Sequence, residues 1–178
     1  DETIIKIATA DAARRRFIEF THGCVRELMT QYGPIDILWY DVKRPLDNAE
    51  GWESDAMNQM VRALQPHILI NNRSGLPEDF STPEGEVKPQ PGERGRGWEA
   101  CMTFNGSSWG YLMGGEIDAW RPRDIVKMLG KACGRGGNLL LNIGPLPDGN
   151  VPPDAIEPLK TVGRWLQRHG EAVYGLLN

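Results

Sequence analysis

Two segments of this sequence carry acidic side chains that could together form a catalytic pair of carboxyl groups. Asp41 directly follows a short apolar run at residues 35–40. Residues 78–99 carry further carboxylates, namely Glu78, Asp79, Glu84, Glu86, Glu93 and Glu99. Two carboxyl groups about 5–5.5 Å apart can cleave a glycosidic bond with retention of configuration, one as nucleophile and one as acid and base. A strand-end Asp and a loop Glu would supply that pair without a cofactor.

Polar and aromatic residues accompany these acids at the ends of the expected strands. Taken singly, each has an ordinary explanation: an Asp after a strand often forms a turn, Arg73 could form a structural ion pair, and Trp39 or Trp109 could belong to a core. Sites of α/β proteins, however, lie at the carboxyl ends of strands. There, aromatic rings stack on sugars, and arginine or the amides of Asn71 and Asn142 can bind hydroxyl groups. The shared position therefore favours a carbohydrate site.

Metal, redox and phosphate sites are not indicated. The cysteines are Cys24, Cys101 and Cys133. They are far apart, and the histidines lack metal-ligand spacing, so we expect buried thiols and no metal centre. The glycines of residues 134–137 follow a helix and precede a strand, the reverse of a phosphate loop. They are expected to end the helix through a positive φ. No Gly-x-Ser-x-Gly elbow occurs, so an α/β-hydrolase is also disfavoured.

The elements that must position these residues alternate between helix and strand. In the first half, helical spacing of Phe17, Phe20, Cys24, Val25, Leu28 and Met29 predicts a helix over residues 10–32, which Gly33 and Pro34 end. Residues 35–40 predict a buried strand and residues 41–53 a polar loop. Ser54 is expected to cap a helix over residues 54–64, with Met57, Met60, Val61 and Leu64 on one face.

The second half repeats this cycle. A second buried strand is expected at residues 67–72, followed by a long loop without periodicity at 73–97 and a weak strand near 100–104. A helix at 122–133, a strand at 138–143 and a long helix at 153–173 complete the chain.

This alternation predicts an α/β fold with a parallel sheet. A doubly wound open sheet and a (β/α)8 barrel both fit. A complete barrel takes about 250 residues, and about four strands are recognisable here, so a barrel would be incomplete, with its N-terminal strands missing. The opening helix, with no strand before it, agrees with that expectation.

Bulk composition excludes some classes of partner. The chain has 178 residues and a net charge of −4, so a nucleic-acid partner is not expected. No apolar stretch approaches the roughly 20 residues of a membrane span, and the chain shows no signal-peptide pattern.

At this point the sequence resembles the α-L-fucosidases of glycoside hydrolase family 29. The matching segments are residues 32–41, 70–73, 79–84, 98–102, 108–111, 136–145, 162–166 and 170–174. The run GGNLLLNIGP at 136–145 is the most specific of them. The segments occur in family order and cover nearly the whole chain.

The resemblance implies a fold, a substrate and roles for residues. Residues 1–178 would be the C-terminal two-thirds of a (β/α)8-like (TIM) barrel, with the family's C-terminal β-sandwich absent. Asp41 would be the nucleophile and Glu84 the acid/base, with Glu86 and Glu99 as alternatives. Trp39, Arg73 and Trp109 would bind the fucose of an oligosaccharide or glycoconjugate. No metal or organic cofactor is implied, and family members are mostly secreted, periplasmic or lysosomal.

Two other functions remain open at this stage. The chain could be a fucose-binding fragment that has lost catalysis, although it retains both carboxylates. It could also be a different hydrolase on a doubly wound sheet, such as a phosphoryl-transfer enzyme. Such an enzyme would need a basic or metal-rich site.

Overall fold

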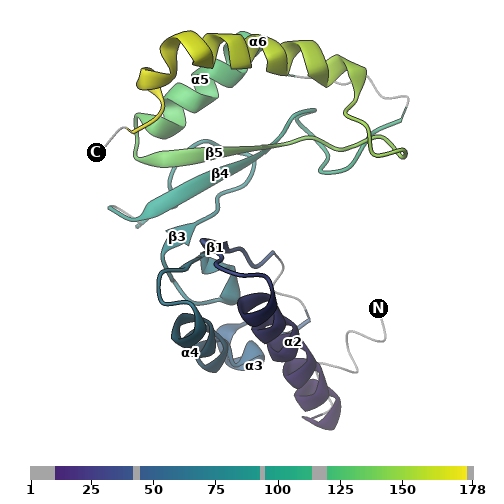
Figure 1. Ribbon diagram of the computed structural model, residues 1–178, viewed down its shortest axis with the longest axis vertical. Coiled ribbons are helices and arrows are strands. Elements are labelled where there is room, and N and C mark those ends of the chain that lie inside the picture. Colours follow the sequence, from purple (N-terminus) through teal and green to yellow (C-terminus); the bar gives the residue numbers. More distant parts are fainter. Residues whose placement is uncertain (1–10, 42–44, 93–94, 114–119, 176–178) are drawn as a thin grey trace. The chain divides into compact units, whose positions relative to one another are not determined.

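The structure is a computed structural model that describes residues 11–41, 45–92, 95–113 and 120–175 (Figure 1). It divides into two compact units, Asp1–Ser81 and Thr82–Asn178. Each unit contains a pair of parallel strands with helices packed on it. The α/β class and the parallel pairing that the sequence predicts are therefore confirmed.

The first unit opens with helix α2 (Asp11–Gln31), whose limits match the predicted helix within one residue. Its buried side chains are Ile18, Val25 and Met29. The predicted apolar face was therefore wrong in part, because Phe20 and Leu28 are exposed. Helical spacing alone does not decide which of these apolar residues face the core, and packing against the neighbouring elements buries Val25 and Met29.

Strands β1 (Ile37–Leu38) and β2 (Leu69–Ile70) are parallel and occupy the two predicted positions, but each has only two residues. Leu38 and Ile70 are buried in the core of the unit, whereas Ile37 and Leu69 are 50% and 48% exposed. The prediction of two buried strands was therefore correct for one face of this pair and wrong for the other within the described residues.

Two helices separate these strands: α3 (Ala49–Trp52) and α4 (Ser54–Leu64). The loop predicted at 41–53 thus contains a short helix. The predicted cap at Ser54 was wrong: Glu53 is the cap residue, with a φ of 52°. The buried Ser54 hydroxyl instead donates to the carbonyl of Ser74 at 2.6 Å, which ties the start of α4 to the turn after β2.

The core of the first unit lies between the two longer helices and the strands. Its buried members are Val25, Met29, Leu38, Met57, Val61, Ile68 and Ile70. After β2 the chain forms a 3₁₀ turn η1 (Asn72–Ser74) and strand β3 (Phe80–Ser81). Apart from Asn72, which was predicted to belong to the strand, these elements fall inside the segment 73–97 that was predicted to be a loop without periodicity.

The second unit is built on β4 (Gly97–Thr103) and β5 (Gly137–Asn142), which pair in parallel from Trp98 opposite Gly137 to Thr103 opposite Asn142. Helices α5 (Pro122–Cys133) and α6 (Pro153–His169) pack over one side of this pair, and η2 (Gly170–Ala172) follows (Figure 1). The limits of α5 agree with the prediction, and β4 is longer than the weak strand that the sequence indicated.

The glycines between α5 and β5 have structural roles, as expected. Gly136 has a φ of 71°, so a left-handed glycine lies in the turn before β5. The residue that ends α5, Gly134, has a φ of −65°, so the positive φ expected at the helix end was wrong there. Gly137 is required for packing, because a Cβ there would lie 2.2 Å from Cε2 of the buried Trp98. The Trp98 ring also donates from Nε1 to the carbonyl of Arg135 at 3.1 Å. Of the cysteines, only Cys101 is fully buried and Cys24 is exposed, so the expectation of buried thiols was correct for one.

Candidate active site

Three of the five predicted site residues come together in the first unit. Asp41 follows β1, and Arg73 lies in η1 directly after β2. Arg73 Nη1 lies 3.2 Å from Asp41 Oδ1 and 3.0 Å from the Asp41 carbonyl oxygen. The guanidinium carbon lies 4.4 Å above the centre of the Trp39 ring. The parallel pairing of β1 and β2 produces this cluster, because it brings the two carboxyl ends side by side.

The exposures of Asp41 and Arg73 differ widely. The Asp41 side chain is 75% exposed and the Arg73 side chain 16%. An ion pair with so exposed a partner adds little stability, about 0–1 kcal/mol. Its consequence is geometric: the carboxylate faces solvent, and a partly buried arginine supported by an aromatic ring holds it in place. Trp39 Nε1 is buried and has no hydrogen-bond partner among the described residues.

The backbone just before Asp41 is fixed by an amide. Asn71 Oδ1 accepts from the Tyr40 N–H at 3.0 Å, and Asn71 Nδ2 donates to the Tyr40 carbonyl at 2.8 Å. Asn71 is completely buried. The interpretation of this amide as a sugar ligand was therefore wrong, because both ends of its carboxamide bind main-chain atoms.

The side chain of Tyr40 is held inside the same unit. Its hydroxyl donates to Asn58 Oδ1 at 3.0 Å. Asn58 Nδ2 in turn donates to Ser74 Oγ at 3.2 Å and to Glu78 Oε1 at 2.6 Å. Burial raises the pKa of the Tyr40 hydroxyl, Glu78 raises it further, and Arg62 opposes the shift. Tyr40 therefore remains a neutral hydrogen-bond donor far into the alkaline range.

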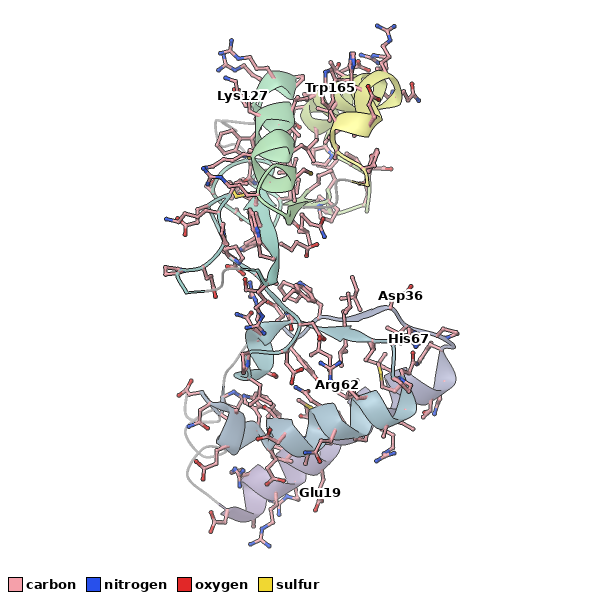
Figure 2. All side chains as sticks on the ribbon, turned by 90° about the vertical axis from the view of Figure 1, so that its left-hand side faces the viewer. Glu19, Asp36, Arg62, His67, Lys127 and Trp165 are labelled. Atoms are coloured by element: carbon pink, nitrogen blue, oxygen red, sulfur yellow. The ribbon has the colours of Figure 1, made fainter. Side chains whose placement is uncertain are left out.

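Two of the candidate loop carboxylates belong to this internal cluster. Arg62 Nη2, on α4 (labelled in Figure 2), lies 2.5 Å from Glu78 Oε2 and 2.8 Å from Asp79 Oδ2. Asp79 Oδ2 also accepts the main-chain N–H of Ile70 at 2.7 Å. These contacts raise the pKa of Arg62. Glu78 and Asp79 thus support the end of β2.

The remaining carboxylates belong to the second unit. Glu84 is exposed, but its backbone is fixed against the middle of β4. The Cys101 N–H donates to the Pro83 carbonyl at 2.8 Å, and the Gly85 N–H donates to the Cys101 carbonyl at 3.0 Å. Glu86 forms an ion pair with Lys88 at 2.9 Å. Glu99 is a half-buried residue of β4 itself, and Glu93 lies outside the described residues.

Trp109 also lies in the second unit, on the loop after β4, and is 47% exposed. Its carbonyl accepts from Asn142 Nδ2 at 2.8 Å. The loop begins with Asn105, whose Oδ1 accepts from the N–H groups of Ser107 and Ser108 at 3.0 and 2.8 Å. The amides of Asn105 and Asn142 therefore shape the loop that carries Trp109.

A close backbone contact fixes this loop to the end of β5. A Cβ on Gly144 would lie 2.4 Å from the carbonyl carbon of Gly110 and 2.5 Å from the Tyr111 nitrogen. No side chain fits between the two segments. Tyr111 and Ile143 line a pocket beside this contact, at the carboxyl ends of β4 and β5.

The predicted residues thus fall into two groups. Asp41, Trp39 and Arg73 form one cluster in the first unit, and Glu84 and Trp109 belong to the second. The sequence reading missed the internal supports at Asn58 and Asn71. Their only sequence signal is a polar residue at the end or on the apolar face of an otherwise buried segment.

Within the part of the chain that the structure describes, no three His, Cys, Asp or Glu side chains cluster as metal ligands would. No described helix has the length and apolarity needed to cross a bilayer.

Comparison with known proteins supplies an independent line of evidence. The model of the alpha-L-fucosidase family matches residues 4–171. Tissue alpha-L-fucosidase of Mus musculus is 31% identical over 161 residues, which cover 83% of this chain and 34% of that protein. Alpha-L-fucosidase of Branchiostoma floridae is 44% identical over 78 residues, covering 43% of this chain and 17% of its own length.

Solved structures agree with these relatives. Alpha-L-fucosidase isoenzyme 1 from Paenibacillus thiaminolyticus superimposes with a TM-score of 0.82 at 34% identity, covering 90% of this chain and 41% of that one. A GH29 alpha-L-fucosidase from Bacteroides thetaiotaomicron, solved as a trapped covalent intermediate with 2-fluoro-fucosyl fluoride, gives 0.80 at 29% identity, covering 92% of this chain and 42% of its own. The chain thus spans less than half the length of these proteins.

Proposed function

The chain belongs to the α-L-fucosidase family, and on that premise we propose that it forms part of an enzyme that hydrolyses α-L-fucosides with retention of configuration. The reaction would pass through a covalent fucosyl–enzyme intermediate. The substrate would be a fucosylated oligosaccharide or glycoconjugate, and no metal or organic cofactor takes part.

The fold that supports this activity is an incomplete (β/α)8-like barrel. Residues 1–178 supply its C-terminal two-thirds, whereas the N-terminal strands and a C-terminal β-sandwich lie outside the chain. The parallel strand pairs with helices between them fit both this arrangement and a doubly wound sheet. The observation that favours the barrel is that the chain superimposes on parts of several fucosidase structures.

Asp41 is the nucleophile. Its exposed carboxylate attacks the anomeric carbon while the bond to the leaving oxygen breaks, which gives the covalent intermediate. The arginine contact at 3.2 Å supports this role, because it holds the attacking oxygen without neutralising it by proton transfer. The position after β1 agrees with the placement of catalytic groups at the carboxyl ends of strands.

Glu84 is the acid and base. Protonated Glu84 gives its proton to the leaving oxygen, and the resulting carboxylate then takes one from the water that hydrolyses the intermediate. Its exposed side chain on a backbone fixed at both neighbours favours it over the two alternatives. Glu86 lies beyond the backbone bridge that joins Glu84 to Cys101 of β4, and Glu99 is a residue of the strand itself.

Trp39, Arg73 and Trp109 bind the fucose. The exposed ring of Trp109 on a fixed loop can cover the apolar side of the sugar, including its C5 methyl group. Trp39 offers a buried indole N–H that lacks a partner among the described residues. Arg73 contacts both Trp39 and Asp41, so it connects the sugar-binding ring to the nucleophile.

The observation that carries this proposal is that Arg73 stacks on Trp39 and forms an ion pair with Asp41 in a chain of this family. The test is NMR observation of aryl α-L-fucoside hydrolysis by the protein that carries this chain. Retention predicts α-L-fucose as the first sugar formed. Initial release of the β-anomer would contradict the nucleophile role. Calorimetric binding of fucose without any turnover would indicate the catalytically inactive binding function.

A further inference from the structure

We propose that Asn71 is a positioning residue for Asp41: its carboxamide fixes the Tyr40 peptide groups and thereby aims the carboxylate. This inference rests on the proposed function, because it concerns the same nucleophile. The hydrogen bonds of the Asn71 side chain go to the Tyr40 backbone, so Asn71 acts on Asp41 through the main chain.

The carboxamide takes the place of a strand ladder. Backbone pairing of β1 with β2 ends at Leu38 and Ile70. Two residues beyond Leu38, Tyr40 still needs partners for its N–H and carbonyl, since buried backbone groups are almost always paired. The Asn71 side chain provides both, at 3.0 and 2.8 Å. The extended course of the chain towards Asp41 therefore depends on one side chain.

Asn71 can do this because its own backbone is anchored. Its N–H donates to the Leu38 carbonyl at 3.4 Å, and it forms a parallel bridge with Phe80. It is also completely buried, so water cannot take over either hydrogen bond. The backbone of Asn71 is therefore anchored both to β1 and to β3.

The clamp acts together with the arginine two residues later. Asn71 holds Tyr40, and Arg73 holds the carbonyl and the carboxylate of Asp41. Tyr40 and Asp41 are therefore each held by a side chain from the same turn after β2. Without the hydrogen bonds from Asn71, the contacts with Arg73 remain to position Asp41 among the described residues. Misplacement of a reacting group by about 1 Å can reduce a rate by about 10²-fold.

Only a carboxamide fits these two partners. An ionised Asp would accept from the Tyr40 N–H but would repel its carbonyl, and a Leu of similar shape offers neither donor nor acceptor. Asn71→Leu therefore removes both bonds while it keeps the branching at Cγ. Asn71→Ser is a second variant, because its smaller hydroxyl leaves room for water and is the safer substitution for folding.

The structure offers a matched control at the other end of β1. Gln65 clamps backbone in the same manner: Oε1 accepts from the Ile35 N–H at 2.7 Å, and Nε2 donates to the carbonyls of Met29 and Gly33 at 2.9 and 3.0 Å. Gln65→Met removes a comparable set of bonds away from Asp41. This control distinguishes the general effect of removing a buried amide from the specific effect of removing the Asn71 amide next to Asp41.

The test is a double-mutant cycle with azide in the protein that carries this chain. Asn71→Leu and Asn71→Ser are each made in the unsubstituted protein and in Asp41→Gly. In the unsubstituted background we expect kcat for an aryl α-L-fucoside to fall about 10²-fold, with KM changed by less than about threefold. In Asp41→Gly with azide the same substitutions should change the rate by less than about twofold, because azide is not attached to Tyr40. Gln65→Met should change neither rate by more than about twofold.

Three outcomes would contradict the inference, each for a different reason. Equal losses in both backgrounds would show that Asn71 maintains the fold and does not position the nucleophile. An unchanged kcat in folded Asn71→Leu or Asn71→Ser would overturn the inference directly. Absence of fucoside cleavage by the unsubstituted protein would contradict the proposed function, and with it this role.

Discussion

One nitrogen of Arg73, Nη1, contacts two oxygens of Asp41: the main-chain oxygen at 3.0 Å and the carboxylate Oδ1 at 3.2 Å. A contact to the carboxylate alone would leave the backbone free to move, and a contact to the carbonyl alone would leave the side chain free to rotate. Together they set both the position and the direction of the carboxylate. The face of Trp39 supports the guanidinium at 4.4 Å.

Arg73→Lys should therefore lose most of the activity although it keeps the charge. Lysine lacks the planar guanidinium that stacks on the Trp39 indole and thereby holds Nη1 against both oxygens of Asp41. We expect kcat/KM to fall by about 10²-fold or more, comparable to a misplacement of about 1 Å. Thermal unfolding should change little, because the exposed Asp41 partner contributes at most about 1 kcal/mol. A large loss of stability with normal kcat in the remaining folded protein would contradict this account.

Glu84→Gln should have an effect that depends on the leaving group. Fucosides with poor leaving groups need proton donation, so their cleavage should slow by about 10²–10⁴-fold. A dinitrophenyl fucoside, which leaves without a proton, should still form the covalent intermediate at nearly the normal rate. Burst kinetics with the two substrates measure this difference.

Glu86→Gln and Glu99→Gln serve as the matched controls for that experiment. Each removes one of the other candidate carboxylates, and neither should show dependence on the leaving group. If either variant reproduces the pattern expected of Glu84→Gln, the acid/base assignment must move to that residue.

Tyr40→Phe should change the alkaline stability of the protein. The pKa of Tyr40 is raised above its ordinary value of 10.0 by burial and by Glu78, with Arg62 opposing. The unfolded chain therefore loses this proton before the folded protein does. The resulting stabilisation is complete below pH 10 and decreases as the pH rises above 10, by up to about 1.4 kcal/mol per pH unit.

The measurement is the free energy of unfolding between pH 8 and 11.5. The unsubstituted protein should lose stability more steeply above pH 10 than Tyr40→Phe does. Near pH 8 the variant should be less stable by about 1 kcal/mol, because it lacks the hydrogen bond to Asn58. Parallel pH profiles for the two proteins would contradict the burial of this hydroxyl.

Gly144→Ala should disturb the loop that carries Trp109. The added methyl group would lie 2.4 Å from the Gly110 carbonyl carbon, so one of the two backbone segments must move. We expect weaker binding of fucose, measured by calorimetry, together with a lower Tm. Gly163→Ala in α6 is the control, because a Cβ there meets no atom within 4 Å. That control should raise stability by about 0.5–1 kcal/mol and leave binding unchanged. Equal binding by both variants would argue against a role for this loop.

The sequence predicted the order and type of the larger elements well. Helix α5 occupies the predicted residues, and the strand pairs are parallel as expected. Local signals suffice for these features, namely a Pro at the helix start, glycines at its end and apolar runs for strands. The face of α2 was not determined locally, because its buried residues depend on which neighbours pack against it.

Part of the candidate site was also predictable from local sequence signals. Asp41, Trp39 and Arg73 follow strands, and parallel pairing brought them together. The inward direction of the Asn71 amide could not be read from sequence, since a polar residue after a strand equally fits a ligand-binding position. It depends on the backbone groups of Tyr40, which lie beyond the β1–β2 pairing and bind the Asn71 side chain instead.

The most direct test of the central claim is Asp41→Gly in the protein that carries this chain, assayed with an aryl α-L-fucoside with and without azide. We predict that turnover falls by at least about 10³-fold, as for loss of an activated nucleophile. Azide should restore cleavage, and the product should be β-L-fucosyl azide, because azide attacks from the vacated face. Normal turnover by the variant, or loss of turnover that azide does not restore, would contradict the assignment of Asp41 as nucleophile.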